Sequence, residues 1–168
     1  MPFTLFHWAV AILALFAFNF FYLPALLVSS VIMDIEPSYY LFFSPREDNV
    51  LHDFFHTYLG VTIIGFIVGA VLIRIRKPID KFFSKFNLGQ EKIPNKLILF
   101  SSLVGAWSHV FFDSLMHWDI KPFFPFTNAN PLLGLISYND VYIVTASGLY
   151  LFLALAVWKF AKKIAKRK

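Results

Sequence analysis

The sequence contains no cysteine among its 168 residues. A disulfide framework, a thiolate metal ligand and a cysteine nucleophile are therefore excluded, and any metal must be bound through nitrogen and oxygen atoms. The chain also lacks the His-Glu-x-x-His motif of zinc proteases and the Lys-x6-Arg-Pro signature of one class of phosphatases. Residues Met1 to Thr4 include no Lys or Arg, so we expect no cleavable signal sequence.

Charged residues are scarce as well, at 15% of the chain, and they are unevenly distributed. Of the 15 Lys and Arg residues, 13 fall in two groups, seven from Arg74 to Lys96 and six from Lys159 to Lys168. Both groups flank apolar runs, which is the pattern of a membrane surface and not of a nucleic-acid-binding face. The net charge of +5 therefore indicates contact with membrane lipid and no nucleic-acid partner, and it leaves the oligomeric state open.

Hydrophobic residues, by contrast, make up 58% of the chain, and 22 of them are Phe. This share exceeds the roughly 45–50% apolar content of soluble domains. Apolar runs of about 20 residues are long enough to cross a bilayer as helices. The sequence predicts an all-α fold, a polytopic membrane helical bundle of about four to five helices, in a single membrane-embedded domain.

The predicted helices of this domain, residues 1–168, follow the apolar runs. The four longer spans cover residues 3–22, 51–73, 97–118 and 140–160. Residues 24–33 form a helix too short to cross alone, which we expect to be partly re-entrant, and residues 78–90 form an in-plane amphipathic helix. We expect Ile35 to Val50 to be an interfacial loop, and Gly105 and Ser108 to allow close helix contact.

All five histidines lie in or at the end of apolar stretches, with Asp and Glu residues beside them. Burying an ionisable group in apolar surroundings is expensive unless the group pairs with another group or with a metal. Two pairs, His52 with His56 and His109 with Asp113, are spaced i,i+4, which places both members on one helix face roughly 6 Å apart. These pairs predict a metal site.

The positive-inside rule places both basic groups in the cytoplasm and so sets the direction of each span. Candidate ligands from four segments then meet at the outer side of the bilayer. The predicted metal ligands are His7, Asp34, His52, His56, His109, Asp113 and His117.

Each of these residues also has a purely structural interpretation. A single histidine on an apolar face is commonly a hydrogen-bonded packing residue, and His52 could simply start a helix at the interface. The pair of His109 and Asp113 could bridge two helices without a metal. Asp34 could be a solvated loop carboxylate, and Asp53 could favour the positive end of a helix dipole.

Four sequence elements, taken in order, resemble a known family. They are the opening Met-Pro-Phe-Thr-Leu-Phe-His7, the Met33-Asp34-Ile35-Glu36 segment, His56-Thr57 followed by Gly60, and Ser108-His109-x-x-x-Asp113 with Pro122 to Phe126. Together they resemble the membrane-bound metal-dependent hydrolases related to the LexA-regulated YdjM inner-membrane proteins. The resemblance covers roughly Met1 to Ser137 and departs from the family at residues 52–56, where His-Asp-Phe-Phe-His replaces a His-Arg-Gly-x-Thr-His block.

The order of the candidate ligands also resembles that of zinc-dependent phospholipase C and the related single-strand nucleases, which split phosphodiesters with a zinc cluster. This resemblance implies that one metal is held by Asp34, His56, His109 and Asp113. It also implies that Asp113 bridges to a second metal, held partly by His7. Of the later ligands in that superfamily only His117 offers a counterpart, so the expectation is one or two ions.

Imidazole and carboxylate ligands suit Zn, Mn or Fe, and zinc is the favoured ion. An open coordination position on such an ion lowers the pKa of bound water from about 15.7 to about 7. We expect Glu36, or alternatively Asp53, to accept the proton of that water. Arg46 and Lys121 lie outside the two basic groups, and either clamp a substrate phosphate or anchor lipid headgroups.

The sequence therefore predicts a membrane-embedded hydrolase of the cell membrane that uses a metal-activated water. Its expected substrate is a phosphoester or a lipid-linked molecule at the extracytoplasmic face. The alternative is a non-enzymatic membrane protein whose metal site is structural and whose role is that of a scaffold or regulator. Metal transport is disfavoured, because the inner halves of the spans hold almost no polar residues that could form a conduction path.

Overall fold

The computed structural model describes residues 4–12, 16, 20–45, 50–90 and 92–165. Every regular element in these ranges is helical. Segments long and apolar enough to cross a membrane cover Leu23–Phe42, Asn95–Met116 and Tyr138–Ala165, and the bent pair Tyr58–Arg74 and Arg76–Ser84 adds a fourth if it counts as one span. The predicted all-α membrane bundle is confirmed.

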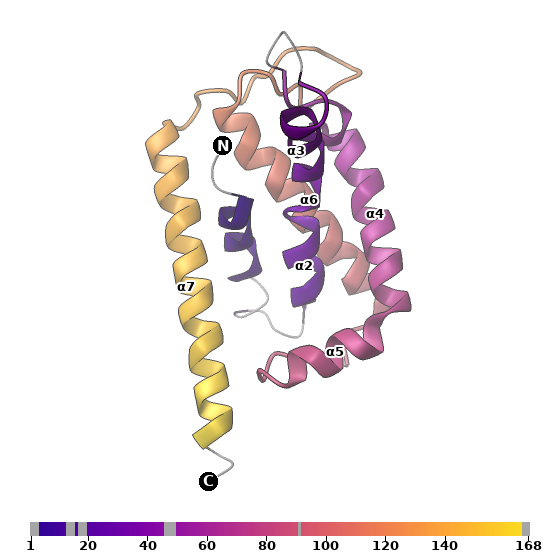
Figure 1. Cartoon of the computed structure of the whole chain (residues 1–168), viewed down its shortest axis with the longest axis vertical. Helices are drawn as coiled ribbons and strands as arrows, with labels where there is room; N and C mark the ends of the chain where they lie inside the picture. The colour runs from indigo at the N-terminus through magenta and orange to yellow at the C-terminus, as the bar shows by residue number, and fades with distance from the viewer. Residues whose placement is uncertain (1–3, 13–15, 17–19, 46–49, 91, 166–168) are drawn as a thin grey trace.

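Successive spans alternate in direction along the bundle, and α2 and α3 run the same way within one span (Figure 1). In chain order they are the 3-10 helix η1 (Thr4–Ala11), α2 (Leu23–Ser29), the 3-10 turn η2 (Ile32–Asp34), α3 (Ile35–Phe42), the 3-10 turn η3 (Phe54–His56), α4 (Tyr58–Arg74), α5 (Arg76–Ser84), α6 (Asn95–Met116) and α7 (Tyr138–Ala165). The predicted first span, residues 3–22, is represented by η1, and its residues 3, 13–15 and 17–19 lie outside the described ranges.

The two ends of the bundle differ in chemistry. Helix α5, which carries three basic residues, crosses the end where α4 finishes and α6 begins, and the C-terminal end of α7 lies at this same end (Figure 1). The C-terminal end of α3, residues 50–57 before α4 and the connection from α6 to α7 lie at the opposite end. The basic groups are therefore separated from these connections by the length of the bundle.

Close packing of α4 against α6 depends on two glycines one turn apart. A Cβ atom on Gly65 would lie 3.1 Å from Cδ2 of Leu103, and one on Gly69 would lie 2.8 Å from Cδ2 of Leu99. Small residues at i and i+4 let two membrane helices approach until their backbones nearly touch. Such a role was expected for Gly105, which packs against Leu26 of α2, but not for Gly65 and Gly69.

At the basic end, side chains from distant parts of the chain satisfy the first backbone N–H groups of α2. Tyr22 N donates to Ser101 Oγ (2.8 Å), and Leu23 N donates to Gln90 Oε1 (2.7 Å). The hydroxyl of Tyr22 donates to Asp80 of α5 (3.2 Å). Helix starts leave N–H groups without intrahelical partners, so these contacts let α2 begin inside the bundle.

The expected interfacial loop from Ile35 to Val50 is wrong in its first half, where α3 forms. Pro37 does not prevent this helix, because it lies in the first turn of α3, where the missing N–H removes no intrahelical hydrogen bond. As a result α2, η2 and α3 together make a span of 20 residues, not the short helix predicted at residues 24–33.

The helical pairing of His52 with His56 is also wrong. Helix α4 begins at Tyr58, not at Leu51, because the side chain of Thr57 accepts a hydrogen bond of 2.9 Å from a backbone N–H three residues later and caps the helix. His56 ends the 3-10 turn η3, and His52 lies in the irregular segment before it. The two histidines still approach each other, but through a turn.

We expect Gly69→Leu to destabilise the bundle, because the new side chain has to displace Leu99 and Ser102 of α6. Overpacking of this kind costs about 1–3 kcal/mol. Thermal unfolding of the purified protein in detergent micelles measures the effect. Ala70→Leu, an exposed position on the same helix, is the matched control, and equal melting temperatures for the two variants would rule out the glycine-mediated contact.

Candidate metal centre

The five histidines of the chain meet at one place. Ring-to-ring contacts connect them in the order His7, His109, His56, His52 and His117, with centroid separations of 4.1, 5.2, 4.5 and 4.7 Å. The rings come from η1, α6, η3, the segment before η3, and the residue that ends α6. Segments more than 100 residues apart in sequence therefore contribute to one cluster of imidazoles.

The centre of this assembly is a four-residue cluster of Asp34, His56, His109 and Asp113. All four residues are buried, and each offers one ligand atom within 4.8 Å of the others. His109 Nε2 lies 3.2 Å from His56 Nε2, 3.3 Å from Asp113 Oδ2 and 3.5 Å from Asp34 Oδ1. The spacing of His109 and Asp113 on one face of α6, predicted from the sequence, is confirmed.

The hydrogen bonds of the two Nδ1 atoms indicate which nitrogen of His56 and of His109 carries the proton. His109 Nδ1 lies 2.8 Å from the carbonyl oxygen of Ser30, and His56 Nδ1 lies 2.8 Å from Glu36 Oε2. Carbonyl and carboxylate oxygens only accept hydrogen bonds, so both Nδ1 atoms carry the proton. In the neutral rings both Nε2 atoms then present lone pairs to each other across 3.2 Å, a repulsive arrangement that a metal ion or an added proton between them would relieve.

The composition of the four-residue cluster fits a divalent metal ion. Two carboxylates and two neutral imidazoles carry a formal charge of −2, which such an ion neutralises. Zinc binds imidazole nitrogen at about 2.0–2.1 Å, so a tetrahedral zinc would hold two nitrogens about 3.3 Å apart, close to the separation of the two Nε2 atoms. In addition, Asp34 Oδ2 is buried without a hydrogen-bond partner.

Glu36 contacts the Nδ1 atom of His56 and not the Nε2 atom, which faces the four-residue cluster. Its carboxylate accepts hydrogen bonds from His56 Nδ1 (2.8 Å) and from the backbone nitrogens of Asp53 (2.8 Å) and Phe55 (3.1 Å). A carboxylate that holds the second nitrogen of a ligating histidine fixes the ring orientation and raises its basicity. Burial lowers the pKa of His56, although the hydrogen bond to Glu36 opposes this shift, so the ring is neutral and able to bind a metal.

His7 approaches the cluster from the other side of Asp113. Its Nε2 lies 3.2 Å from Asp113 Oδ1 without the geometry of a hydrogen bond, and both His7 Nδ1 and Asp113 Oδ1 are buried without hydrogen-bond partners. The two oxygens of Asp113 thus face different histidines, His109 and His7. This is the position that a bridging carboxylate would take.

A three-residue cluster of His52, His117 and Asp119 lies beside the first, joined to it by the contact of His52 with His56. Asp119 accepts hydrogen bonds from the His52 ring (2.9 Å) and from the backbone nitrogens of Leu51 (2.9 Å) and His52 (3.2 Å). Burial raises the pKa of Asp119, but these hydrogen bonds outweigh it and hold the pKa below its usual range. Burial lowers the pKa of His117 to about 4.

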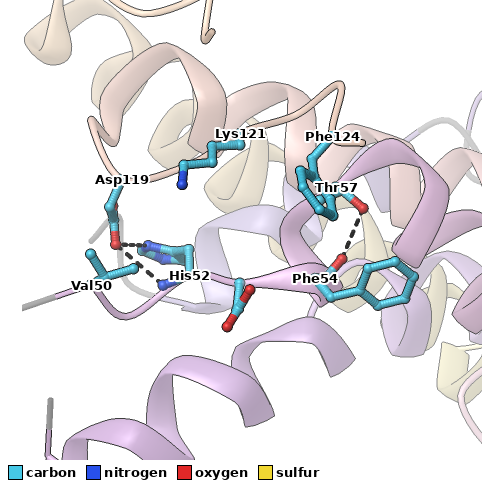
Figure 2. Close-up of a pocket in the computed structure, with 8 residues that line it drawn as sticks. Val50, His52, Phe54, Thr57, Asp119, Lys121 and Phe124 are labelled. Atoms are coloured by element: carbon cyan, nitrogen blue, oxygen red, sulfur yellow. Dashed lines mark hydrogen bonds and ion pairs between the residues drawn. The ribbon is translucent and has the colours of Figure 1, made fainter. Parts of the chain in front are cut away.

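A cavity of about 160 Å³ opens beside the three-residue cluster. It is lined by Val50, His52, Asp53, Phe54, Thr57, Asp119, Lys121 and Phe124. Figure 2 shows the ammonium group of Lys121 extending over the side of the cavity that His52 and Asp119 form. Lys121 and Asp53, predicted as substrate-binding and proton-accepting residues, both line this cavity, whereas Arg46 lies outside the described residues.

Two features of the centre were not predicted from the sequence. Asp119 is not among the predicted site residues, although it follows His117 by only two positions. The carbonyl of Ser30, which sets the protonation of His109, had no signal in the sequence, because any residue type supplies a carbonyl.

We expect His109→Ala and Asp113→Ala each to release the bound metal, because each variant removes a ligand atom from the four-residue cluster. Each should also destabilise the protein by about 3–5 kcal/mol, since loss of the metal leaves the remaining carboxylates of the cluster buried without a counter-charge. Metal analysis by mass spectrometry and thermal unfolding measure the two effects. Ser114→Ala, a buried position of α6 whose hydroxyl has no partner, is the control. An unchanged metal content in the double variant His109→Ala/Asp113→Ala would refute the assignment.

A comparison with protein families matches the chain over residues 3–166 to the family described as YdjM inner membrane protein. No curated protein and no solved structure matches the chain significantly. The match covers nearly the whole chain and agrees with the resemblance found in the four sequence elements. The chain belongs to the YdjM inner membrane protein family.

Proposed function

We propose that this chain is a membrane-embedded, metal-dependent hydrolase that uses water to cleave a phosphoester of a lipid-linked substrate. The observation that carries the proposal is the pair of Nε2 atoms of His56 and His109, 3.2 Å apart with both Nδ1 protons engaged elsewhere. A metal held by the four-residue cluster would lower the pKa of a coordinated water enough to provide hydroxide near neutral pH.

The surrounding residues have distinct roles in this proposal. Glu36 positions His56, because its carboxylate is occupied by three hydrogen bonds on the far side of the ring. Asp53 is the proton acceptor, since it is exposed and lines two of the cavities near η3. Lys121 binds the anionic group of the substrate from its place at the cavity beside the three-residue cluster.

Cavities along α3 support a lipid-linked substrate. A cavity of about 370 Å³ runs along Val31, Ile35, Tyr39 and Phe43, and Asp34 of the four-residue cluster lines it as well. An apolar groove that leads to a candidate metal ligand suits an acyl or polyprenyl chain attached to a polar head. The head would then lie near the histidines.

The charge distribution supports an extracytoplasmic site. The basic residues of α5 and the basic end of α7 lie at the end of the bundle opposite to the α3–α4 and α6–α7 segments (Figure 1). Lys and Arg concentrate on the cytoplasmic side of membrane proteins. The α5 end therefore faces the cytoplasm in this proposal, and the metal centre faces outward.

Four protein ligands in one cluster also favour a second candidate function. Structural zinc sites are closed by four protein ligands, whereas catalytic sites keep a position for water. A non-enzymatic scaffold or regulatory protein with a structural metal would use Asp34, His56, His109 and Asp113 as a closed set. Catalysis at this cluster requires the metal to accept a fifth ligand.

Labelling from one side of the membrane tests the orientation. A Lys85→Cys variant introduces a single thiol into a chain without cysteine, at an exposed position just after α5. We expect an impermeant maleimide to label it only after the membrane is permeabilised. A Lys121→Cys variant is the matched control, and we expect it to be labelled in intact cells. Exchanged labelling patterns would overturn the outward-facing centre.

Hydrolysis itself is tested with the purified, metal-loaded protein and with phospholipids and polyprenyl phosphates as substrates. We expect Asp53→Asn to keep the metal and to lose about 10²–10⁴-fold in turnover, the range typical for loss of a general base. Asp140→Asn, which removes an exposed carboxylate at the start of α7, is the control. A metal-loaded wild-type protein that is inert toward both substrate classes would favour the structural alternative.

A further inference from the structure

The three-residue cluster contains nitrogen atoms without partners. His52 Nδ1 donates to Asp119 Oδ2 (2.9 Å), so the neutral ring has its lone pair on Nε2. That Nε2 is buried without a hydrogen-bond partner, in a residue that is only 4% exposed, and His117 Nε2 is buried without a partner as well. Buried polar atoms are rarely left unpaired, so this pair of nitrogens points to a ligand.

The geometry of the cluster suits a cation. One ligand atom from each of His52, His117 and Asp119 lies within 4.8 Å of the others. All three hydrogen bonds to Asp119 end on Oδ2, which orients His52 and leaves Oδ1 for another interaction. A histidine held by a carboxylate at one nitrogen is the usual arrangement of a metal-binding imidazole.

The ligand number differs from that of the first cluster. Three protein ligands leave a fourth position of a tetrahedral ion open, as in catalytic zinc sites. Here His52 and Asp119 also line the cavity of about 160 Å³. Figure 2 shows both residues at this cavity, with Lys121 on the same side.

The charges at this cavity favour an anion. One carboxylate and two neutral imidazoles leave a divalent cation with a net charge of +1. The ammonium group of Lys121 adds a positive charge and the carboxylate of Asp53, which also lines the cavity, adds a negative one, so the net charge stays positive. An oxygen of a phosphate group can occupy an open metal position while a lysine neutralises its remaining charge.

We propose that His52, His117 and Asp119 bind a second divalent cation, whose open coordination position faces the cavity and receives, together with Lys121, a phosphate oxygen. The cation site stands on the geometry of the three residues alone, whereas the phosphate as substrate group rests on the hydrolase proposed above. The centre then contains two ions, one held by four residues and one held by three.

Metal stoichiometry tests the second cation. We expect the metal-free, full-length wild-type protein to bind two equivalents of Zn²⁺ in a titration against a competing chelator, and the His52→Ala/His117→Ala variant to bind one. Lys121→Ala, which changes the same cavity without removing a ligand, should still bind two. A wild-type protein that binds a single equivalent overturns the proposal, whether or not the double variant folds.

Inorganic phosphate tests the open position. We expect calorimetry to detect phosphate binding to the zinc-loaded wild-type protein, and this binding to be lost in His52→Ala/His117→Ala and weakened in Lys121→Ala. Phosphate binding that is unchanged in the double variant overturns the assignment of the open position. Two bound ions with phosphate binding but no hydrolysis would support the second site and refute the hydrolase, so the two proposals can fail separately.

Discussion

The structure depends on the neutralisation of ionisable groups that are buried inside the helical bundle. Asp34 and Asp113 are buried together, and no Lys or Arg contacts them among the described residues. The histidines around them supply hydrogen bonds and lone pairs but only limited positive charge. A divalent cation bound by the four-residue cluster would resolve this imbalance and would also join η2, η3 and α6 at one point. The fold at this end of the bundle is therefore organised around a charge, not around an apolar core.

At the opposite end of the bundle a buried carboxylate is also neutralised, but there by protein side chains. There the carboxylate of Asp80 is paired with Arg76 (3.0 Å) and with the hydroxyl of Tyr22, and Gln90 joins α2 to the connection after α5. Between the two polar ends, α4 and α6 are held by glycine-mediated contact. A membrane helix gains little from apolar contact alone, because lipid is equally apolar. The bundle is thus stabilised by polar networks at its two ends and by close helix packing between them.

Contacts between residues of one regular helix could be predicted from the sequence, whereas contacts made through turns could not. His109 and Asp113 lie one turn apart on an uninterrupted helix, so their spacing defined their contact. His52 and His56 have the same spacing, but Thr57 caps α4 after them and the chain turns where a helix was expected. Asp119 was missed because it reaches His52 across a distance of 67 residues in sequence. Composition and periodicity describe the spans, whereas loop residues are placed by tertiary hydrogen bonds.

The order in which the chain is synthesised determines when the segment from Leu51 to His56 can form its hydrogen bonds. Its backbone N–H groups bind two carboxylates from elsewhere, Glu36 at the start of α3 and Asp119 after α6. During translation Glu36 is available before this segment emerges, but Asp119 appears only after α4, α5 and α6 have been made. Contacts between residues far apart in sequence form late because they close long loops. The candidate metal centre is consequently complete only once about two thirds of the chain has been made.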